Sequence, residues 1–419
     1  MMTNQSRGLP RNPRLTYRFQ NRGFEFFFQW ILGAQTHGGV ELGECFYAAS
    51  EIQDGSPESW CTAWAKLAQR VEKRAQTSFN NGHRISAREA YQRAYAYYRA
   101  APAFLSPLKD SRYKELWHKA QTCFRKAAAL FDPPIQAVLI PFENGHLPGY
   151  CLRPEVGAAA RPTLIMVGGA DTFAEDLYFY IGPAALKRGY NLLLVDLPGQ
   201  GGLPFEGLVM RADSEIPMKA VVDYVLAQPA VDPERLAVYG ISAGGYLVPR
   251  ALTREKRIKA CVACSIILDF SQIMPSNIAT LEDSLRFRLI KALLPHKLQA
   301  ALNLFETYMW RWGAESLAEL YTIMQRFTLD PNLITCPILN LVAEQEYTYF
   351  DSGRLWAHQC LEQIANPHNQ LIITPQNEGA DSHAVGTNLS LMSQLVFDWL
   401  DEVLQPQAQT ELTVSPAQV

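Results

Sequence analysis

The sequence predicts an α/β fold in which a mostly parallel sheet, flanked by helices, follows an N-terminal helical cap. Up to about residue 131, apolar residues recur at helical spacing. From about residue 135, short apolar runs alternate with helical stretches, and each run is continuously hydrophobic. Continuous hydrophobicity is typical of parallel strands that are covered on both faces. We therefore expect a helical cap domain over residues 1–132, an α/β domain over residues 133–405 and a disordered tail over residues 406–419.

Three predicted helices form most of the cap. In "SPESWCTAWAKLAQRVEKRAQTSF", apolar residues follow Trp60 at positions i+4, i+7 and i+11, which places them on one helical face. In "SAREAYQRAYAYYRAAPAFL", Ser86 and Glu89 have the spacing of a capping box, so we expect this helix to begin at Ser86. The third helix, "SRYKELWHKAQTCFRKAAALF", is expected to end at Pro133-Pro134.

The α/β part begins with a predicted hairpin, because "QAVLIPF" and "LPGYCLR" flank "ENGH", which contains an Asn-Gly turn signal. Between the fourth and fifth of the later strands, a helical insertion at about 272–328 is rich in aromatic residues and methionine. Its length favours a lid over the sheet, and plain helical packing is the alternative. The predicted parallel strands are "TLIMVGG", "NLLLVDLPG", "RLAVYG", "ACVACSIIL", "CPILNLVA" and "QLIIT".

Composition and charge exclude several classes of partner. The net charge of −3 and the lack of a Lys/Arg-rich run argue against nucleic acid. The apolar run "FEFFFQWILGA" is too short to span a bilayer and lacks a signal-peptide cleavage site, so we expect a cytoplasmic protein without a membrane partner. No cofactor or metal is implied, because no His/Asp cluster has ligand spacing. The oligomeric state stays open, with a homodimer as one option.

Eight cysteines are scattered along the chain, and Cys261 and Cys264 form the one C-x-x-C pair. A redox or zinc pair needs exposed thiolates, and zinc needs two further ligands at matching spacing. Because the pair lies within the apolar stretch "IKACVACSIIL", we expect buried structural thiols.

The stretch "VYGISAGGYL" places Ser242 between Gly240 and Gly244, after a predicted strand and before a predicted helix. A nucleophilic serine can sit on such a strand-to-helix turn, where the turn is so tight that side chains two residues away on either side would collide. Glycine at both places meets that steric requirement. The position between strand and helix favours a catalytic nucleophile over a serine that merely forms a turn.

A serine hydroxyl is a weak nucleophile and needs a base within hydrogen-bond reach. Where the nucleophile lies on such a turn, the chain order is serine, acid, histidine. His383 follows the last predicted strand in a glycine-containing loop, where the base belongs, and the alternative is an ordinary loop histidine. His296 falls in the insertion, His358 in a helical stretch and His368 at the wrong end of the last strand.

The acid should follow the strand "CPILNLVA", and Glu344, Glu346 and Asp351 in "AEQEYTYFDSG" are the candidates. We favour Glu346, because many hydrolases end this strand with G-x-x-D, and Ala343 and Glu346 take the two places here. Asp351 is the alternative acid. Either carboxylate would orient the imidazole and stabilise it once protonated.

An oxyanion hole requires backbone N–H donors. Ala243, the residue after the nucleophile, is expected to provide one, and Gly169 in "IMVGGADTF" the other, because glycine lets the backbone approach closely. Asp171 beside it is expected either to bind substrate or to cap the next helix. The glycine-rich "DLPGQGG" is predicted to be an ordinary loop, because no Lys-Ser/Thr follows as in a phosphate-binding loop.

The chain resembles the capped α/β-hydrolases that include 2,6-dihydroxypseudooxynicotine hydrolase and the fungal polyketide-shortening hydrolases of melanin pathways. The resemblance runs from "DGSPESWCTAWAKLAQR" and "GHRISAREAYQRAYAYYRAA" through "PTLIMVGGADTFAEDLYFY" to "EQEY" and "EGADSHAVGTN". It implies that Ser242, Gly169 and His383 match the family's nucleophile, oxyanion turn and histidine. Where the family commonly has Asp as the acid, this chain has Glu346. Members cleave carbon–carbon bonds beside a ketone or ester-type bonds.

These observations predict a serine hydrolase that acts on a bulky, aromatic or polyketide-like ketone or ester. One alternative keeps the acyl-serine chemistry but excludes water, which gives acyl transfer or cyclisation. A further alternative is a non-catalytic binding protein that uses the cap groove. The intact serine, base and acid candidates argue against that last alternative.

Overall fold

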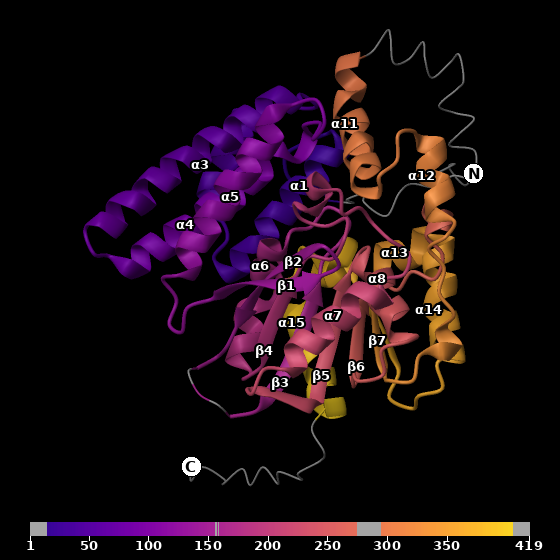
Figure 1. Cartoon of the computed structure of the whole chain (residues 1–419). Coiled ribbons are helices and arrows are strands. Elements are labelled where there is room, and N and C mark those ends of the chain that lie inside the picture. The colour runs from indigo at the N-terminus through magenta and orange to yellow at the C-terminus, as the bar shows by residue number, and fades with distance from the viewer. Residues whose placement is uncertain (1–14, 156, 158, 275–294, 405–419) are drawn as a thin grey trace, which may run out of the picture.

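The computed structural model describes residues 15–274, except 156 and 158, and residues 295–404, in which one eight-stranded sheet lies below two groups of helices (Figure 1). The predicted fold class is confirmed. The predicted tail at 406–419 lies outside the described residues, as does the part of the predicted insertion from 275 to 294. The domain boundaries at 132 and 405 stay predictions, and the first strand begins at Gln136.

The sheet has the order β1-β2-β4-β3-β5-β6-β7-β8. The predicted hairpin forms the antiparallel strands β1 and β2, and β2 also pairs with β4 in antiparallel fashion. The six predicted apolar runs form β3 to β8, which pair in parallel. The strands are β1 Gln136–Phe142, β2 Gly145–Leu152, β3 Arg161–Val167, β4 Asn191–Val195, β5 Val231–Ile241, β6 Ala260–Cys264, β7 Ile338–Ala343 and β8 Gln370–Thr374.

Alternate residues of the central strands enter two separate cores. Leu164 and Met166 of β3 pack with α6, α15 and the N-terminal helices, whereas Ile165 and Val167 pack with α7, α8 and α14. Because both faces are covered, every position of these strands favours an apolar residue. The helices around the sheet are α6 Ala174–Lys187, α7 Glu215–Leu226, α8 Gly244–Leu252, α13 Glu344–Tyr349, α14 Asp351–Gln363 and α15 Leu389–Leu404.

The N-terminal helices pack around an aromatic cluster, in which the ring centroids of Phe24 and Phe104 lie 4.5 Å apart and those of Phe24 and Trp60 4.7 Å apart. The Trp60 indole N–H donates to the Ala100 carbonyl at 2.9 Å, so its one polar atom is satisfied. These elements are α1 Arg22–Gly33, η1 Ala34–His37, α2 Leu42–Ser50, α3 Pro57–Asn80, α4 Arg84–Ala100, η2 Ala101–Phe104 and α5 Ser111–Ala128.

Two predicted helix ends were wrong. Helix α4 begins at Arg84 after His83, so Ser86 lies inside the first turn and forms no capping box. The chain reverses at Gly82, whose φ of 78° suits glycine, and the packing of α3 against α4 sets the start of the helix. Helix α5 ends at Ala128, because the segment that follows it turns toward β1 before reaching Pro133.

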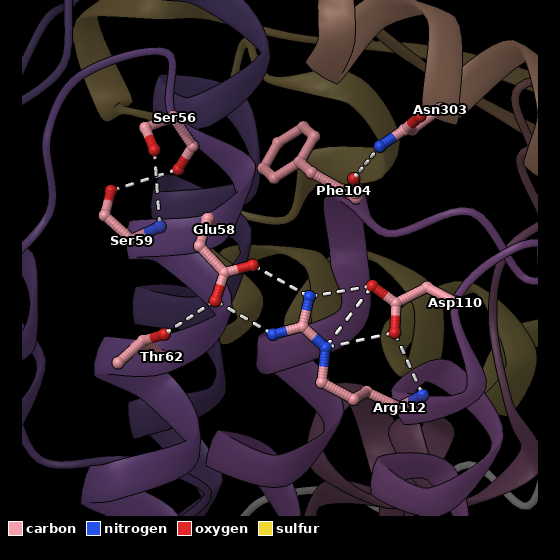
Figure 2. Close-up of polar contacts among 8 residues, drawn as sticks. All are labelled: Ser56, Glu58, Ser59, Thr62, Phe104, Asp110, Arg112 and Asn303. Carbon is pink, nitrogen blue, oxygen red and sulfur yellow. Dashed lines mark hydrogen bonds and ion pairs between the residues drawn. The ribbon is translucent and has the colours of Figure 1, made fainter.

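Arg112 of α5 joins two helix N-termini of the cap (Figure 2). Its guanidinium donates to Glu58 at 2.8 and 2.9 Å and to Asp110, the N-cap residue of α5, at 2.7 Å. The hydrogen bonds from Arg112 lower the pKa of both carboxyl groups. Ser56 caps α3 by accepting from the Ser59 N–H at 3.3 Å.

The insertion forms α11 Pro295–Trp312 and α12 Leu317–Met324 within the described residues. An antiparallel bridge between Asp269 and Thr328 closes its base. Its upper part contacts the cap, because the Asn303 side chain donates to the Phe104 carbonyl at 2.7 Å (Figure 2). Below, the fully buried Arg311 side chain donates to the Gly199 carbonyl at 3.1 Å. The insertion is therefore fastened to the cap and to the loop after β4.

The cysteine pair of β6 is buried as predicted. Cys261 and Cys264 are free thiols with at most 1% exposure, and burial raises the pKa of both. None of the helices in the described ranges has the length and apolar character needed to cross a membrane.

Candidate active site

Ser242 lies on the turn between β5 and α8 with a φ of 54°, in the left-handed region that costs a non-glycine residue about 1–2 kcal/mol. A Cβ at Gly240 would lie 2.2 Å from the Gly244 carbonyl oxygen, and one at Gly244 would lie 2.8 Å from the Val167 carbonyl oxygen. Both glycines are therefore required for the turn, as the sequence predicted. The Ser242 N–H donates to the Cys264 carbonyl at 2.7 Å, which ties the turn to β6.

The structure brings His383 to Ser242, with 2.9 Å between the imidazole Nε2 and the serine Oγ. His383 begins η7, His383–Val385, in the loop after β8. The next two residues of this loop have positive φ values of 55° and 53°. The Tyr180 hydroxyl donates to the Ala384 carbonyl at 2.6 Å and so holds this strained backbone in place.

Glu346 is the candidate acid that contacts His383. Its Oε1 pairs with the imidazole Nδ1, and its Oε2 accepts a 2.5 Å hydrogen bond from the Ser265 hydroxyl. The Glu346 side chain is 5% exposed, so little water competes for it. An Nδ1–H held by the carboxylate leaves Nε2 as the acceptor for the Ser242 hydroxyl. Ser265 was missed in the sequence, although its place directly after β6, at the carboxyl edge of the sheet, was a usable signal.

The other carboxylates and histidines considered in the sequence do not contact His383 or Ser242 among the described side chains. Asp351 has a side chain that is 77% exposed and pairs with Arg354 at 3.4 Å. Glu344 accepts from the Gln376 N–H at 2.8 Å. His358 bonds the Tyr347 hydroxyl on the surface. The side chain of His296 lies outside the described residues.

The predicted oxyanion turn lies against Ser242. A Cβ at Gly169 would lie 2.9 Å from the Ser242 Cβ, which explains the glycine. The Gly169 N–H, however, donates to the Thr172 hydroxyl at 2.9 Å. In the described part of the chain, neither the Ala170 N–H nor the Ala243 N–H has a protein acceptor, and both residues line a cavity with Ser242. Ala170 therefore replaces Gly169 as the candidate second donor.

The loop "DLPGQGG" supports this turn from behind. Gln200 is fully buried, and its side-chain N–H groups donate to the carbonyls of Gly168 at 2.6 Å and Gly169 at 3.0 Å. Its side-chain oxygen accepts from the Leu197 N–H at 2.9 Å. The sequence predicted an ordinary loop here and missed this support, because the contact joins segments about thirty residues apart.

Two cavities adjoin Ser242 and His383. The larger, of about 410 Å³, lies under the insertion, and the smaller, of about 90 Å³, lies under α4. Phe26 and Phe27 of α1 line both. The insertion thus covers the candidate site, in agreement with the lid interpretation. Apolar side chains dominate the larger cavity, among them Ile266, Leu304, Phe305, Trp312, Met324 and Trp356.

Asp171 lines the smaller cavity. Helix α6 begins after Phe173, and the Asp176 side chain accepts from the Phe173 N–H at 3.1 Å. Within the described ranges, no group of three or more His, Cys, Asp or Glu side chains is arranged to hold a metal ion.

A mostly parallel sheet with a serine on a strand-to-helix turn, hydrogen-bonded to a histidine from the loop after the last strand, defines an α/β-hydrolase. The model of the FrsA-like esterase family matches residues 54–280, and the chain belongs to this family. Its curated relatives are fungal hydrolases that match over nearly their whole length.

Two of these relatives show the extent of the match. The 20-hydroxy-prefusarin hydrolase of Gibberella moniliformis is 32% identical over 91% of this chain and 97% of its own. A hydrolase of a Fusarium species is 33% identical over 92% of this chain and 97% of its own. Among solved structures, 2,6-dihydroxy-pseudo-oxynicotine hydrolase has a TM-score of 0.69 at 23% identity, over 89% of this chain and 95% of that chain. This structure supports the fold.

Proposed function

We propose that the protein is a serine hydrolase that cleaves a bulky, largely apolar ketone or ester, with Ser242 as nucleophile, His383 as base and Glu346 as the orienting acid. The observation that carries the proposal is the continuous chain of contacts from Ser242 through His383 to Glu346 beneath an apolar cavity. A cavity of about 410 Å³ lined by aromatic and aliphatic side chains favours a large apolar ligand. One relative is named for 20-hydroxy-prefusarin.

The reaction begins when His383 removes the Ser242 hydroxyl proton and Oγ adds to the substrate carbonyl. The N–H groups of Ala243 and Ala170 would stabilise the oxyanion that forms. Collapse of this intermediate breaks the bond to the leaving group, which takes the electron pair and receives the proton from His383. Water, activated by the same imidazole, then hydrolyses the acyl-serine and restores the enzyme.

The same steps serve esters and ketones. From an ester, the leaving group departs as an alcohol. From a ketone, a carbon–carbon bond breaks, and this requires the electron pair to be stabilised, as in the enolate of a second carbonyl group. The residues around Ser242 supply the acyl chemistry in both cases, and the substrate decides which bond is cleaved.

Acyl transfer or cyclisation is the second candidate function, because the apolar lining of the larger cavity disfavours water beside Ser242. Product analysis in ¹⁸O-labelled water separates the two. Hydrolysis places one ¹⁸O atom in the released acid, whereas transfer to a substrate nucleophile places none.

A fluorophosphonate probe tests the proposal directly. The wild-type protein and the Ser265→Ala variant should both be labelled, the latter more slowly, because Ser265 lies in the same cavity but only supports Glu346. Ser242→Ala should not be labelled, and both Ser242→Ala and His383→Ala should lose ester turnover while keeping the wild-type circular dichroism spectrum. Labelling or turnover in folded Ser242→Ala would exclude this nucleophile and favour a different function for the cavity. The expected cytoplasmic location and a homodimer stay predictions.

A further inference from the structure

The two cavities meet at the atoms proposed to react. Ser242 and His383 line both, and so do Phe26 and Phe27 of α1. A molecule whose carbonyl carbon is within reach of the Ser242 Oγ would therefore extend in two directions. One part would enter the space under the insertion, and the other would enter the space under α4.

The cavities differ about fourfold in volume, at about 410 and 90 Å³. A cavity of about 150 Å³ in another protein holds one benzene ring. By that measure the smaller cavity favours a short group of a few heavy atoms, and the larger one has room for a polycyclic or long-chain group. The bond that is cleaved should therefore lie near one end of the substrate.

A positively charged side chain, that of Arg99 in α4, lines the smaller cavity. Its Nε donates to the Asp176 Oδ2 at 3.0 Å, and its Nη2 donates to the Asp171 carbonyl at 2.5 Å. The Tyr95 hydroxyl donates to the other Asp176 oxygen at 2.5 Å, so both carboxylate oxygens are engaged. The guanidinium plane also lies over the Phe173 ring, with 4.2 Å from Cζ to the centroid. Arg99 is thus held rigidly from three sides.

A guanidinium has five N–H donors, and the bonds to Asp176 and Asp171 use two of them. The side chain keeps 19% exposure and lines the cavity beside Ser242. A group with an acceptor oxygen is the natural ligand for the remaining donors. The Asp176 carboxylate already neutralises the guanidinium, so the remaining donors suit the oxygen of a neutral carbonyl.

We infer that the smaller cavity is a subsite for a short oxo-bearing arm of the substrate, whose carbonyl oxygen is bound by Arg99, while the larger cavity takes the apolar remainder. This inference rests on the proposed function and specifies its substrate as a β-dicarbonyl compound. When the carbon–carbon bond breaks, the electron pair moves into the second carbonyl and its oxygen becomes an enolate. Arg99 then binds a charged oxygen, so it stabilises the transition state more than the ground state.

Two naphthyl substrates separate this role from general catalysis. 1-(2-Naphthyl)butane-1,3-dione has a large aryl arm and a short oxo arm, whereas methyl 2-naphthoate has the same aryl arm and no second carbonyl. We expect 2-naphthoic acid and acetone from the diketone. Arg99→Gln should lower kcat/KM for the diketone about 100-fold, which is the size of effect expected when one oxyanion donor is removed. The same variant should lower kcat/KM for the ester less than about 10-fold. Arg99→Lys should recover part of the loss. Equal losses on both substrates would overturn the inference.

Arg99 also neutralises Asp176, so its variants can fail to fold. Ala103→Leu fills the same cavity without touching the ion pair, and Ala301→Leu in the larger cavity is its matched control. Ala103→Leu should reduce diketone turnover and spare the methyl ester, and extending the terminal methyl of the diketone to hexyl should abolish turnover by the wild type. If the wild-type protein cleaved the hexyl compound as fast as the methyl compound, the size limit on the smaller cavity would be refuted.

Binding to the Ser242→Ala protein tests the subsite apart from catalysis. Calorimetry should show the diketone binding at least 10-fold more tightly than 2-butylnaphthalene, and Arg99→Gln should remove that difference. Binding with this pattern but no turnover in the wild type would refute the proposed function and retain the subsite. Ester turnover that depends on Ser242, without the Arg99-dependent difference in binding, would retain the function and refute the subsite.

Discussion

The side-chain amide of Gln200 donates to the carbonyl oxygen of Gly169 at 3.0 Å, and it joins the loop after β4 to the turn that lies against Ser242. The same amide also holds Gly168. On the other side of the loop, Arg311 of the insertion donates to the Gly199 carbonyl at 3.1 Å. The loop after β4 is therefore hydrogen-bonded on one side to α11 and on the other side to the candidate oxyanion turn.

Gln200→Met should lower kcat for ester substrates about 10- to 100-fold with little change in KM. The change keeps the side-chain volume but leaves the Gly168 carbonyl without its donor and the Gly169 carbonyl with only the 3.4 Å bond from the Thr172 N–H, so the turn that presents the Ala170 N–H loses support. Steady-state kinetics with a thermal melt measure both effects. Gln200→Glu should be worse, because a carboxylate placed against two carbonyl oxygens repels them. A fall in melting temperature with unchanged kcat would mean that Gln200 serves stability alone.

Gly33→Ala should lower kcat at least about 10-fold, because a Cβ at the end of α1 would lie 2.0 Å from the Gly386 carbonyl oxygen. Gly386 directly follows η7, which contains His383, so the clash should displace the His383 imidazole. A small displacement of a catalytic group lowers the reaction rate by a large factor. Gly43→Ala in α2 is the matched control, since nothing lies within 4 Å of its new methyl group. Equal activity of the two variants would show that α1 does not position His383.

Glu346→Gln should reduce kcat about 10³- to 10⁴-fold, because a neutral amide no longer stabilises the imidazolium. Asp351→Asn should change kcat less than about 2-fold, since the Asp351 side chain is 77% exposed and pairs with Arg354. Ser265→Ala should fall between them, as it removes one hydrogen bond to the acid. Kinetics of the three purified variants decide the acid, and a reversed order for Glu346 and Asp351 would assign it to Asp351.

Arg112→Gln should lower the free energy of unfolding by about 1 kcal/mol at pH 7 and low salt, the upper range for exposed pairs. Hydrogen bonds from Arg112 lower the pKa of Glu58 and Asp110 in the folded protein. Their stabilising contribution is therefore complete above the unfolded pKa of about 4 and is lost as the pH falls through the lower folded values. Denaturation at pH 7 and pH 3 should show the difference between variant and wild type shrinking in acid.

Lys119→Gln, which breaks the exposed pair with Glu115 on the same helix, is the control for that series. It should cost less than about 0.5 kcal/mol, as for other pairs spaced i, i+4 on a helix. Raising the salt concentration to 0.5 M should reduce both effects. An effect of Arg112→Gln that is independent of pH would contradict the assignment to its two carboxylates.

The strands and the serine turn were predictable because each depends on neighbours in the sequence. Continuous apolar runs such as Leu192–Val195 identify strands buried on both faces, and two glycines two residues from Ser242 identify the tight turn. The start of α4 was predicted wrongly from Ser86, because helix packing, rather than local capping, sets that boundary.

The sequence by itself determined the fold class, the position of Ser242 and the order of the residues proposed to act with it. Only the tertiary structure decided which carboxylate reaches His383, that the Gly169 N–H is engaged by Thr172, and that Ser265 and Gln200 support the site. The physical reason is the range of the interactions. Strand burial and turn sterics act over a few consecutive residues, whereas these hydrogen bonds form mostly between segments that are brought together by packing of the sheet, the cap and the insertion.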